Sequence, residues 1–489
     1  MLFNTLDFVF FFIIVLTTIF VIKQRKFQHI FIILASCFFL YYSSNYQIVL
    51  LIFTTLWTFY LAKIINLTKD EKKKKYFLIL TLGANLGLLG FFKYSDFAIS
   101  EINNMSSYFG GGNIPLLNLI LPIGISFYTF HAMGYVIDVY RRNIEPSNSL
   151  REYMLFVTFF PQLVAGPILR AGQFIPQLRE KMAGSSLTKL RLIVIENPNL
   201  KLGVTMMIFG FFKKMFFADN ISPLVNQIFQ NPVGAESFTI ILGALAFAIQ
   251  IYGDFSGYSD IAIGAALIMG FKIPPNFNKP YFAKSPSDFW RRWHISLSTW
   301  VRDYLYFPLV FNNRRSDLRV FSSLMISFFF LGLWHGAGWN FIIYGTFHGA
   351  YVSVETIIRK RSKYLRENKF FKTKIGTIFS ILVTQYLIFL AFIAFRVHDL
   401  DGISYAMKKF VFLDFATSQT LEIIKSFEIP MILVIVFMTL HYISYKKGNM
   451  IEIVSKLRPS YWFLFSTTVV LLIVLFYGGT PEEFIYFDF

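Results

Sequence analysis

The sequence is short of the residues that build disulfide frameworks, metal sites and soluble surfaces. It has one cysteine, Cys37, in 489 residues, which excludes an internal disulfide and a multi-cysteine metal site. Charged residues make up 15% of the chain, well below the roughly one quarter found in soluble domains. No histidine pair has the spacing of a helical metal site, and there is neither a Walker loop nor a dinucleotide fingerprint. We therefore expect no bound metal or cofactor and no nucleotide hydrolysis.

Apolar and aromatic residues are abundant instead, at 55% and 19% of the chain. Apolar runs long enough to cross a bilayer recur from end to end, and no soluble domain fits between them. We predict an all-α polytopic membrane protein with about 11–14 transmembrane or re-entrant helices in one domain, residues 1–489. Its sections would be N-terminal helices (1–150), a catalytic core with re-entrant elements (151–357) and C-terminal helices (358–489). The candidate spans are residues 6–22, 29–43, 47–66, 76–94, 116–137, 152–168, 203–218, 237–252, 256–273, 320–334, 338–357, 373–396, 428–445 and 461–478.

The net charge of +18 is distributed in short runs beside apolar segments. This pattern is typical of cytoplasmic loops that follow the positive-inside rule, and it argues against nucleic-acid binding. The basic runs alternate with Ser43–Asn45 and Ser95–Pro115, which contain no Lys or Arg. We therefore expect an extracytoplasmic N-terminus, an outer loop at Ser95–Pro115, and a first membrane helix at 6–22 rather than a signal peptide. The basic runs are Lys23–Lys26, Lys72–Lys75, Arg141–Arg142, Lys213–Lys214 and Arg359–Lys363.

Two apolar segments contain residues that interrupt membrane helices. Phe159–Pro167 has two prolines and a glycine, and Gln250–Asp260 has two glycines and two carboxylates. Irregular backbone at membrane depth is tolerated only where it is buried in protein or lines a wet cavity. We therefore predict a break in each segment, with two short spans meeting near residue 255, and a cavity within the bilayer.

Residues 285–312 are predicted to form an interfacial element rather than a span. Ser285 is a candidate N-cap, Pro286 suits the first helical position, and Asp288 completes a capping pattern. Large apolar side chains at a spacing of three to four would share one face of a helix lying at headgroup depth. These residues are Trp290, Trp293, Leu297 and Trp300.

Two histidines are the candidate catalytic residues. His335 ends the apolar run from Val320 to Trp334, where an ionisable group is costly and usually functional. It could act as a general base that takes a proton from an acceptor hydroxyl, or it could be a histidine bonded to a neighbouring helix for packing. His294 follows an arginine pair, and it could orient a substrate or simply anchor the interfacial helix. His131 and His348 could line the same cavity, although each is more often a core histidine.

Charged residues provide a weaker set of candidates. Asp254 and Asp260 are carboxylates inside an apolar stretch and should have partners there; alternatively, Asp254 caps a helix that begins near Phe255. Arginines near the interfacial element could bind the phosphates of a coenzyme A thioester, or they could be ordinary positive-inside charge. Those arginines are Arg291, Arg292, Arg302, Arg314 and Arg315. Trp290, Trp293 and Trp334 complete the candidate substrate-binding set.

Several segments together resemble the membrane-bound O-acyltransferase (MBOAT) family, and in particular its alginate O-acetyltransferase branch. They include Leu-Trp-His-Gly-Ala at 333–337 and Asp-Phe-Trp-Arg-Arg-Trp-His at 288–294. The others are residues 86–94, 121–130, 159–168, 254–264 and the closing segment 484–489. The chain departs from the branch at Gly253, where an aromatic residue is usual, and in the segment after Pro308.

The resemblance implies a bundle of helices around a central funnel or tunnel, with one histidine deep in the membrane and another on a cytosolic-side re-entrant element. By motif these are His335 and His294. It also implies transfer of a small acyl group, typically acetyl, from acetyl-CoA or another thioester to an extracytoplasmic polysaccharide, often through an exported partner protein. The expected location is the cytoplasmic membrane, in contact with its lipids.

Three other functions stay open on the sequence. A transporter or flippase for an acylated lipid or glycan precursor would use the intramembrane carboxylates, although no internal repeat supports it. A D-alanyl-type transferase acting on a cell-wall polymer is a sister activity. A non-catalytic scaffold for an export complex would not need His335.

Overall fold

The computed structural model describes residues 1–22, 24–164, 166–183, 197–311, 316–363, 368–478 and 484–485. These residues form helices and connecting segments without a strand, and six helical stretches are long and apolar enough to cross a membrane. The prediction of an all-α, multi-pass membrane protein is therefore confirmed. The chain divides into two compact units: Met1–Val204 with Ala262–Pro274, and Thr205–Ile261 with Pro275–Phe489.

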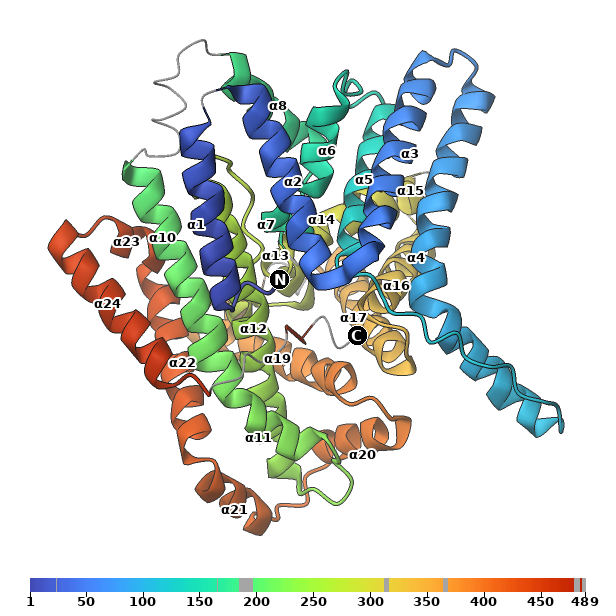
Figure 1. Cartoon of the computed structure of the whole chain (residues 1–489). Helices are drawn as coiled ribbons and strands as arrows, with labels where there is room; N and C mark the ends of the chain where they lie inside the picture. The colour runs from blue at the N-terminus through green and yellow to red at the C-terminus, as the bar shows by residue number, and fades with distance from the viewer. Residues whose placement is uncertain are drawn as a thin grey trace. The chain divides into compact units, whose positions relative to one another are not determined.

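The helices of the described part follow one another along the chain as coloured in Figure 1. The helices up to residue 268 are α1 (Leu6–Val21), α2 (Arg25–Ser44), α3 (Ile48–Leu67), α4 (Glu71–Tyr108), α5 (Ile125–Tyr140), α6 (Leu150–Thr158), α7 (Phe160–Leu163), α8 (Ala171–Ala183), α10 (Asn197–Phe211), a π-helical stretch (Phe212–Ala218), α11 (Asp219–Phe229) and α12 (Ser237–Ile268). Then come α13 (Pro286–Arg292), α14 (Ile295–Val301), a second π-helical stretch (Arg302–Tyr306), α15 (Phe307–Val310), α16 (Asp317–His335), α17 (Trp339–Arg361), α19 (Lys374–Arg396), α20 (Leu400–Val411), α21 (Ser418–Ser426), α22 (Glu428–Lys447), α23 (Met450–Ser455) and α24 (Pro459–Leu475). Short 3-10 turns occupy Asn45–Gln47, Pro280–Phe282 and Lys369–Lys372.

Short polar side chains fix where many of these helices begin. Each accepts a hydrogen bond from a backbone N–H of the first turn, which would otherwise lack a partner. The capping residues are Thr5, Asp70, Ser149, Ser285, Ser316, Thr373, Asp399 and Asn449.

Helix α4 is longer than the sequence suggested. It continues through the first part of the expected loop Ser95–Pro115, and its 38 residues span about 57 Å, far more than a hydrocarbon core of about 30 Å. The chain then returns along the helix (Figure 1) and is bonded to it, because the Asn103 side chain pairs with both backbone groups of Ile114 at 2.8 Å. The span expected at 116–137 is helical only from Ile125. The prediction of a loop is therefore wrong for residues 95–108, where neither glycine nor proline interrupts the helix.

The break predicted in Phe159–Pro167 is confirmed, but it is buried in protein. Phe159, which lies between α6 and α7, and Phe160, the first residue of α7, are fully buried. The backbone donors at the break bind side chains of other helices. Phe160 N–H donates to Ser36 Oγ at 3.1 Å, and Leu169 N–H donates to His131 Nε2 at 3.0 Å. His131 is therefore a bonded core histidine of the first unit.

The break predicted in Gln250–Asp260 is wrong, because α12 is one helix of 32 residues through this segment. Its glycines allow close packing instead of interrupting the helix. A Cβ at Gly253 would lie 2.9 Å from the carbonyl oxygen of Lys213, and one at Gly257 would lie 2.7 Å from that of Gly210. Gly253, one of the departures from the family pattern, thus stands where an aromatic side chain would collide with backbone.

The contact of α10 with α12 predicts that Gly257→Ala destabilises the protein. The new methyl group must displace backbone rather than a flexible side chain, and overpacking of this kind costs about 1–3 kcal/mol. Gly83→Ala is the matched control, because nothing lies within 4 Å of a Cβ at that helical position. It should be neutral or more stable by up to about 1 kcal/mol. Thermal unfolding of the two purified variants in the same detergent measures the difference, and equal midpoints would contradict the packing role.

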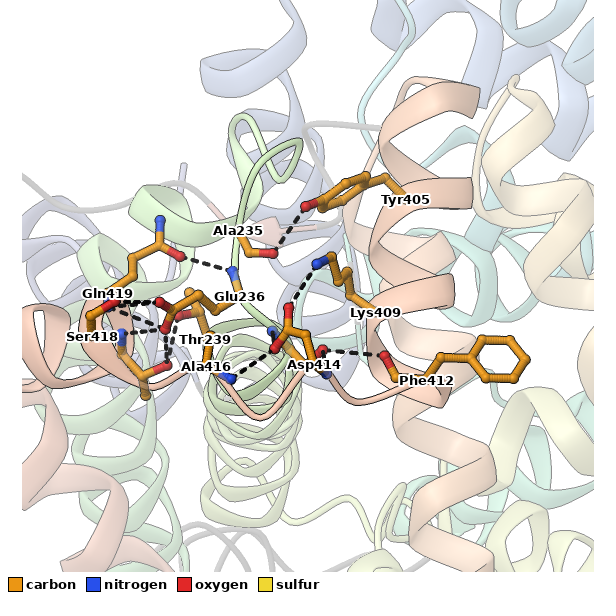
Figure 2. Close-up of polar contacts among 12 residues, drawn as sticks. Ala235, Glu236, Thr239, Tyr405, Lys409, Phe412, Asp414, Ala416, Ser418 and Gln419 are labelled. Atoms are coloured by element: carbon orange, nitrogen blue, oxygen red, sulfur yellow. Dashed lines mark hydrogen bonds and ion pairs between the residues drawn. The ribbon is translucent and has the colours of Figure 1, made fainter.

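A polar cluster ties the start of α12 to the connection between α20 and α21 (Figure 2). The Glu236 carboxylate accepts hydrogen bonds from the Ser418 hydroxyl at 2.7 Å and from Gln419 N–H at 3.1 Å, at the start of α21. Asp414 accepts from Lys409 at 2.7 Å and from Ser237 N–H at 3.3 Å. The bond from Ser418 lowers the pKa of Glu236, and the bond from Lys409 lowers the pKa of Asp414 to about 2. Both carboxylates therefore stay ionised at neutral pH.

Candidate active site

The predicted interfacial element begins as expected. Ser285 Oγ accepts a hydrogen bond from Asp288 N–H at 3.2 Å, and Pro286 occupies the first position of α13. The prediction that the large apolar side chains share one face of a single helix is wrong, however, because the chain bends between α13 and α14. His294 stands at the bend with φ 42°, in the left-handed region that few non-glycine residues adopt. The expected headgroup tryptophans are instead buried in protein, at most 6% exposed: Trp290, Trp293 and Trp300.

The extended segment before α13 holds this bend in place. Asn278 N–H donates to the carbonyl of Arg292 at 2.8 Å, and Ile295 N–H donates to the carbonyl of Asn276 at 2.9 Å, so both sides of the bend are bonded. The Asn276 side chain also accepts from Ser296 N–H at 3.2 Å and from the Ser296 hydroxyl at 2.7 Å. These bonds stabilise the positive φ of His294. The role of Asn276 could not be predicted, because nothing in the neighbouring sequence indicates pairing across 20 residues.

His294 is completely buried and faces aromatic rings. The Phe255 ring meets it edge-on at 4.6 Å between centroids, and Trp334 lies at 5.8 Å. Within the described residues neither ring nitrogen has a hydrogen-bond partner. Burial lowers the pKa of His294 to about 3, so the imidazole is neutral at physiological pH. A neutral, buried imidazole offers a substrate one donor and one acceptor.

His335 is the last residue of α16 and is 3% exposed. Its ring contacts Trp334 at 5.0 Å, Tyr344 at 5.6 Å and Phe395 at 5.2 Å. Trp334 therefore contacts both candidate histidines. The structure brings His294 and His335, 41 positions apart in sequence numbering, to the same indole.

Two glycines allow α16 and α17 to approach closely around His335. A Cβ on Gly345 of α17 would lie 3.0 Å from Cα of Gly332 of α16, so only glycine fits at this crossing. The two helices run side by side in Figure 1. Close contact of this kind is typical of membrane helices whose interfaces carry small residues.

His348 extends the aromatic cluster toward α13. Its Nδ1 accepts the indole N–H of Trp290 at 3.2 Å, and its ring contacts Tyr344 at 4.6 Å. Tyr344 thus lies between His335 and His348. His348 is a bonded, fully buried histidine beside the site, and Trp290 orients it.

The family of the chain follows from a comparison with known proteins. The model of the MBOAT, membrane-bound O-acyltransferase family matches residues 37–392, which include both histidines. The chain belongs to the MBOAT family. It is 38% identical over 340 residues to a probable alginate O-acetylase of Pseudomonas putida, covering 69% of this chain and 66% of that protein. It is 35% identical over 384 residues to a peptidoglycan O-acetyltransferase of Helicobacter pylori, covering 73% and 69%.

A more distant relative is a teichoic acid D-alanyltransferase of Bacillus subtilis, 29% identical over 296 residues, covering 58% of this chain and 70% of that protein. The chain spans between about half and two thirds of the length of the alginate O-acetylases that it matches.

The candidate arginines near His294 differ in how accessible their guanidinium groups are. Arg292 is paired with Asp288 at 3.1 Å, and Arg302 with Asp303 at 2.7 Å. Arg291 has a side chain that is 68% exposed and lies 3.4 Å from Asp288, so its guanidinium is the most accessible of the three. Arg314 and Arg315 lie outside the described residues.

The intramembrane carboxylates have lysine partners. Lys213 lies 2.7 Å from Asp260, and Lys214 lies 2.8 Å from both Asp254 and Asp219. The expectation of partners was correct, whereas the alternative in which Asp254 caps a helix is wrong, because α12 runs through it. The lysines come from the π-helical stretch, and neutralising the carboxylates lets α12 continue without a break.

Asn276 provides a test of the bend. Asn276→Ala removes the acceptor for both Ser296 donors, and we expect acyl-transfer activity to fall about tenfold, because small displacements of catalytic groups are costly. Ser259→Ala removes only the acceptor of the Asn276 amide group and leaves both Ser296 bonds in place, so it should retain more activity. The acyl-transfer activity of the two variants, normalised to the amount of folded protein, shows whether the Ser296 bonds are needed. Equal losses would show that the Ser296 bonds do not matter.

Proposed function

We propose that this protein is an O-acetyltransferase that moves an acetyl group from a thioester donor to a hydroxyl group of an extracytoplasmic polysaccharide or its carrier protein. The observation that carries the proposal is the meeting of His294 and His335 at Trp334, in a member of a family of O-acyltransferases. The names of the relatives favour acetyl as the acyl group and a glycan as the acceptor.

The reaction needs a base, an electrophile and a leaving group. His335 takes the proton of the acceptor hydroxyl while the oxygen attacks the thioester carbonyl carbon. The tetrahedral intermediate collapses with cleavage of the C–S bond, and the leaving thiolate receives the proton that His335 took from the hydroxyl, which returns the imidazole to its neutral form. His294, neutral and buried, donates or accepts a hydrogen bond to hold the thioester in place. The aromatic walls around both rings keep water away from the thioester.

The donor is expected from the cytosolic side. Arg291, the most exposed of the described arginines near His294, is our candidate for binding the phosphates of a coenzyme A thioester. Trp290 and Trp293 are buried and support this element from within, and Trp334 contacts both histidines. We also propose that Asp254 and Asp260 belong to the substrate-binding region. The contacts observed for these two carboxylates are their ion pairs with Lys214 and Lys213.

The proposed setting is the cytoplasmic membrane, with the N-terminus outside. Under the positive-inside rule, the basic end of α17 lies in the cytoplasm, where Lys360 and Arg361 pair with Asp317. An exported acetyltransferase partner would receive or pass on the acetyl group. The single membrane domain with three sections stays a prediction.

An assay with a labelled donor tests the proposal. Purified protein in lipid vesicles, given acetyl-CoA labelled in the acetyl group and an extracytoplasmic glycan fraction, should form an alkali-labile ester on the acceptor. A transporter would move a precursor without forming this bond and would depend on an ion gradient. The D-alanyl alternative, which the teichoic acid relative favours, predicts transfer from a D-alanyl thioester in place of acetyl. If neither donor gave an ester on the acceptor, the proposal of an acyl transferase would be wrong.

A further inference from the structure

A buried carboxylate on α12 binds a segment from the far end of the chain. Asp254 is 3% exposed, and one of its oxygens lies 2.8 Å from the Lys214 ammonium. The other oxygen accepts a hydrogen bond from the backbone N–H of Ile485 at 2.8 Å, across 231 sequence positions. The same carboxylate is thus held in place by a lysine and itself holds a backbone donor, an arrangement that is strong when water is excluded.

The residue before that bond packs onto the wall of the active site. Phe484 is 1% exposed and stacks on Tyr258 at 4.6 Å between ring centroids. Its ring also contacts Phe255 at 5.8 Å, and Phe255 meets the His294 ring at 4.6 Å. A continuous set of contacts therefore runs from the bond at Asp254, through Phe484 and Phe255, to His294.

We propose that Asp254 is a positioning residue, which anchors the segment Phe484–Ile485 so that Phe484 holds Phe255 against His294. The inference rests on the proposed function, because it gives His294 a part in acyl transfer. Without the anchor, Phe484 leaves the ring cluster and Phe255 loses one of its neighbours. Phe255 could then turn, and His294, whose ring has no hydrogen bond to the described residues, would lose part of the packing that fixes its orientation.

Cysteine labelling tests the anchor directly. In a Cys37→Ala background the chain has no cysteine, so Ile485→Cys introduces a single thiol whose reaction with a maleimide reports release of the segment. We expect slow labelling with Asp254 present and labelling at least about tenfold faster in Asp254→Leu, which removes the acceptor at similar volume. Asp254→Asn keeps an accepting oxygen and should stay close to the slow rate. Asp260→Leu, a loss of the other lysine-paired carboxylate on α12, should leave the labelling rate unchanged.

Kinetics test the consequence for the site. Asp254→Leu should lower kcat on the order of tenfold to a hundredfold, with the KM for the donor nearly unchanged, and Asp254→Asn should recover most of kcat. Phe484→Ala should lower kcat in the same way without disturbing the ion pairs, whereas Phe484→Tyr should keep most of it. These last two variants decide the question even if Asp254→Leu does not fold.

Three results would overturn the inference. Slow labelling in Asp254→Leu would show that Asp254 is not the anchor. Fast labelling with an unchanged kcat, or a full kcat in Phe484→Ala, would show that the segment does not position the site. If the wild-type protein transfers no acyl group, the proposed function fails, while the labelling rates still decide whether Asp254 anchors the segment.

Discussion

His335→Gln should lower kcat for acetyl transfer by about 10²–10⁴-fold, the usual contribution of a positioned general base. Glutamine is close to histidine in size and keeps hydrogen-bonding groups, so it can fill the space between Trp334, Tyr344 and Phe395, but it cannot take up a proton at neutral pH. The KM for the donor should change little, because the proposed function places the thioester near His294 and the arginines, away from the substituted side chain. Single-turnover transfer of labelled acetyl to the acceptor measures the effect.

His441→Gln is the matched control for this variant. His441 is a buried histidine of the same unit, packed against Phe282 at 5.3 Å and Phe437 at 5.8 Å, and it has no contact with His335 among the described interactions. It should retain activity within about twofold, since it tests only the loss of a buried imidazole. If His335→Gln transferred acetyl at the wild-type rate, His335 would not be the base. If both variants lost activity equally, the loss would reflect packing.

The boundaries of the site could be predicted from the sequence where local chemistry decides them. Ser285 and Pro286 begin α13 because capping is a property of a few neighbouring residues. His335 ends α16 because glycines follow it. The motifs also selected the two histidines that meet at Trp334, although their contact could not be derived from spacing.

The errors have a common physical cause, which is that tertiary partners decide what a glycine or a charge does. Gly253 and Gly257 looked like helix breakers, but in the structure they accommodate the backbone of the π-helical stretch. The carboxylates beside them looked like a polar gap, but Lys213 and Lys214, some 40 residues earlier, neutralise them. The interfacial tryptophans likewise pack inside the protein. Such partners are distant in sequence, and pattern alone does not reveal them.

Lys214→Met should produce the largest loss of stability among the substitutions considered. Lys214 is 3% exposed and lies 2.8 Å from both Asp254 and Asp219, so methionine would leave buried carboxylates without their counter-charge. Removing one partner of a buried ion pair costs about 3–5 kcal/mol, whereas the pair itself contributes much less relative to apolar residues. The thermal midpoint in detergent should fall by several degrees, with poor yield of folded protein.

Lys213→Met is the matched control, because it removes a neighbouring lysine of the same π-helical stretch whose partner is better solvated. The Lys213 and Asp260 side chains are 19% and 18% exposed, so water can compensate for part of the lost pair, and a cost of about 1 kcal/mol is expected. The double variant Lys214→Met with Asp254→Asn should regain part of the midpoint lost in Lys214→Met, because it also removes one uncompensated charge. Equal midpoints for the two single lysine variants would show that burial does not set the strength of these pairs. A double variant no more stable than Lys214→Met would place the cost at Asp219 instead.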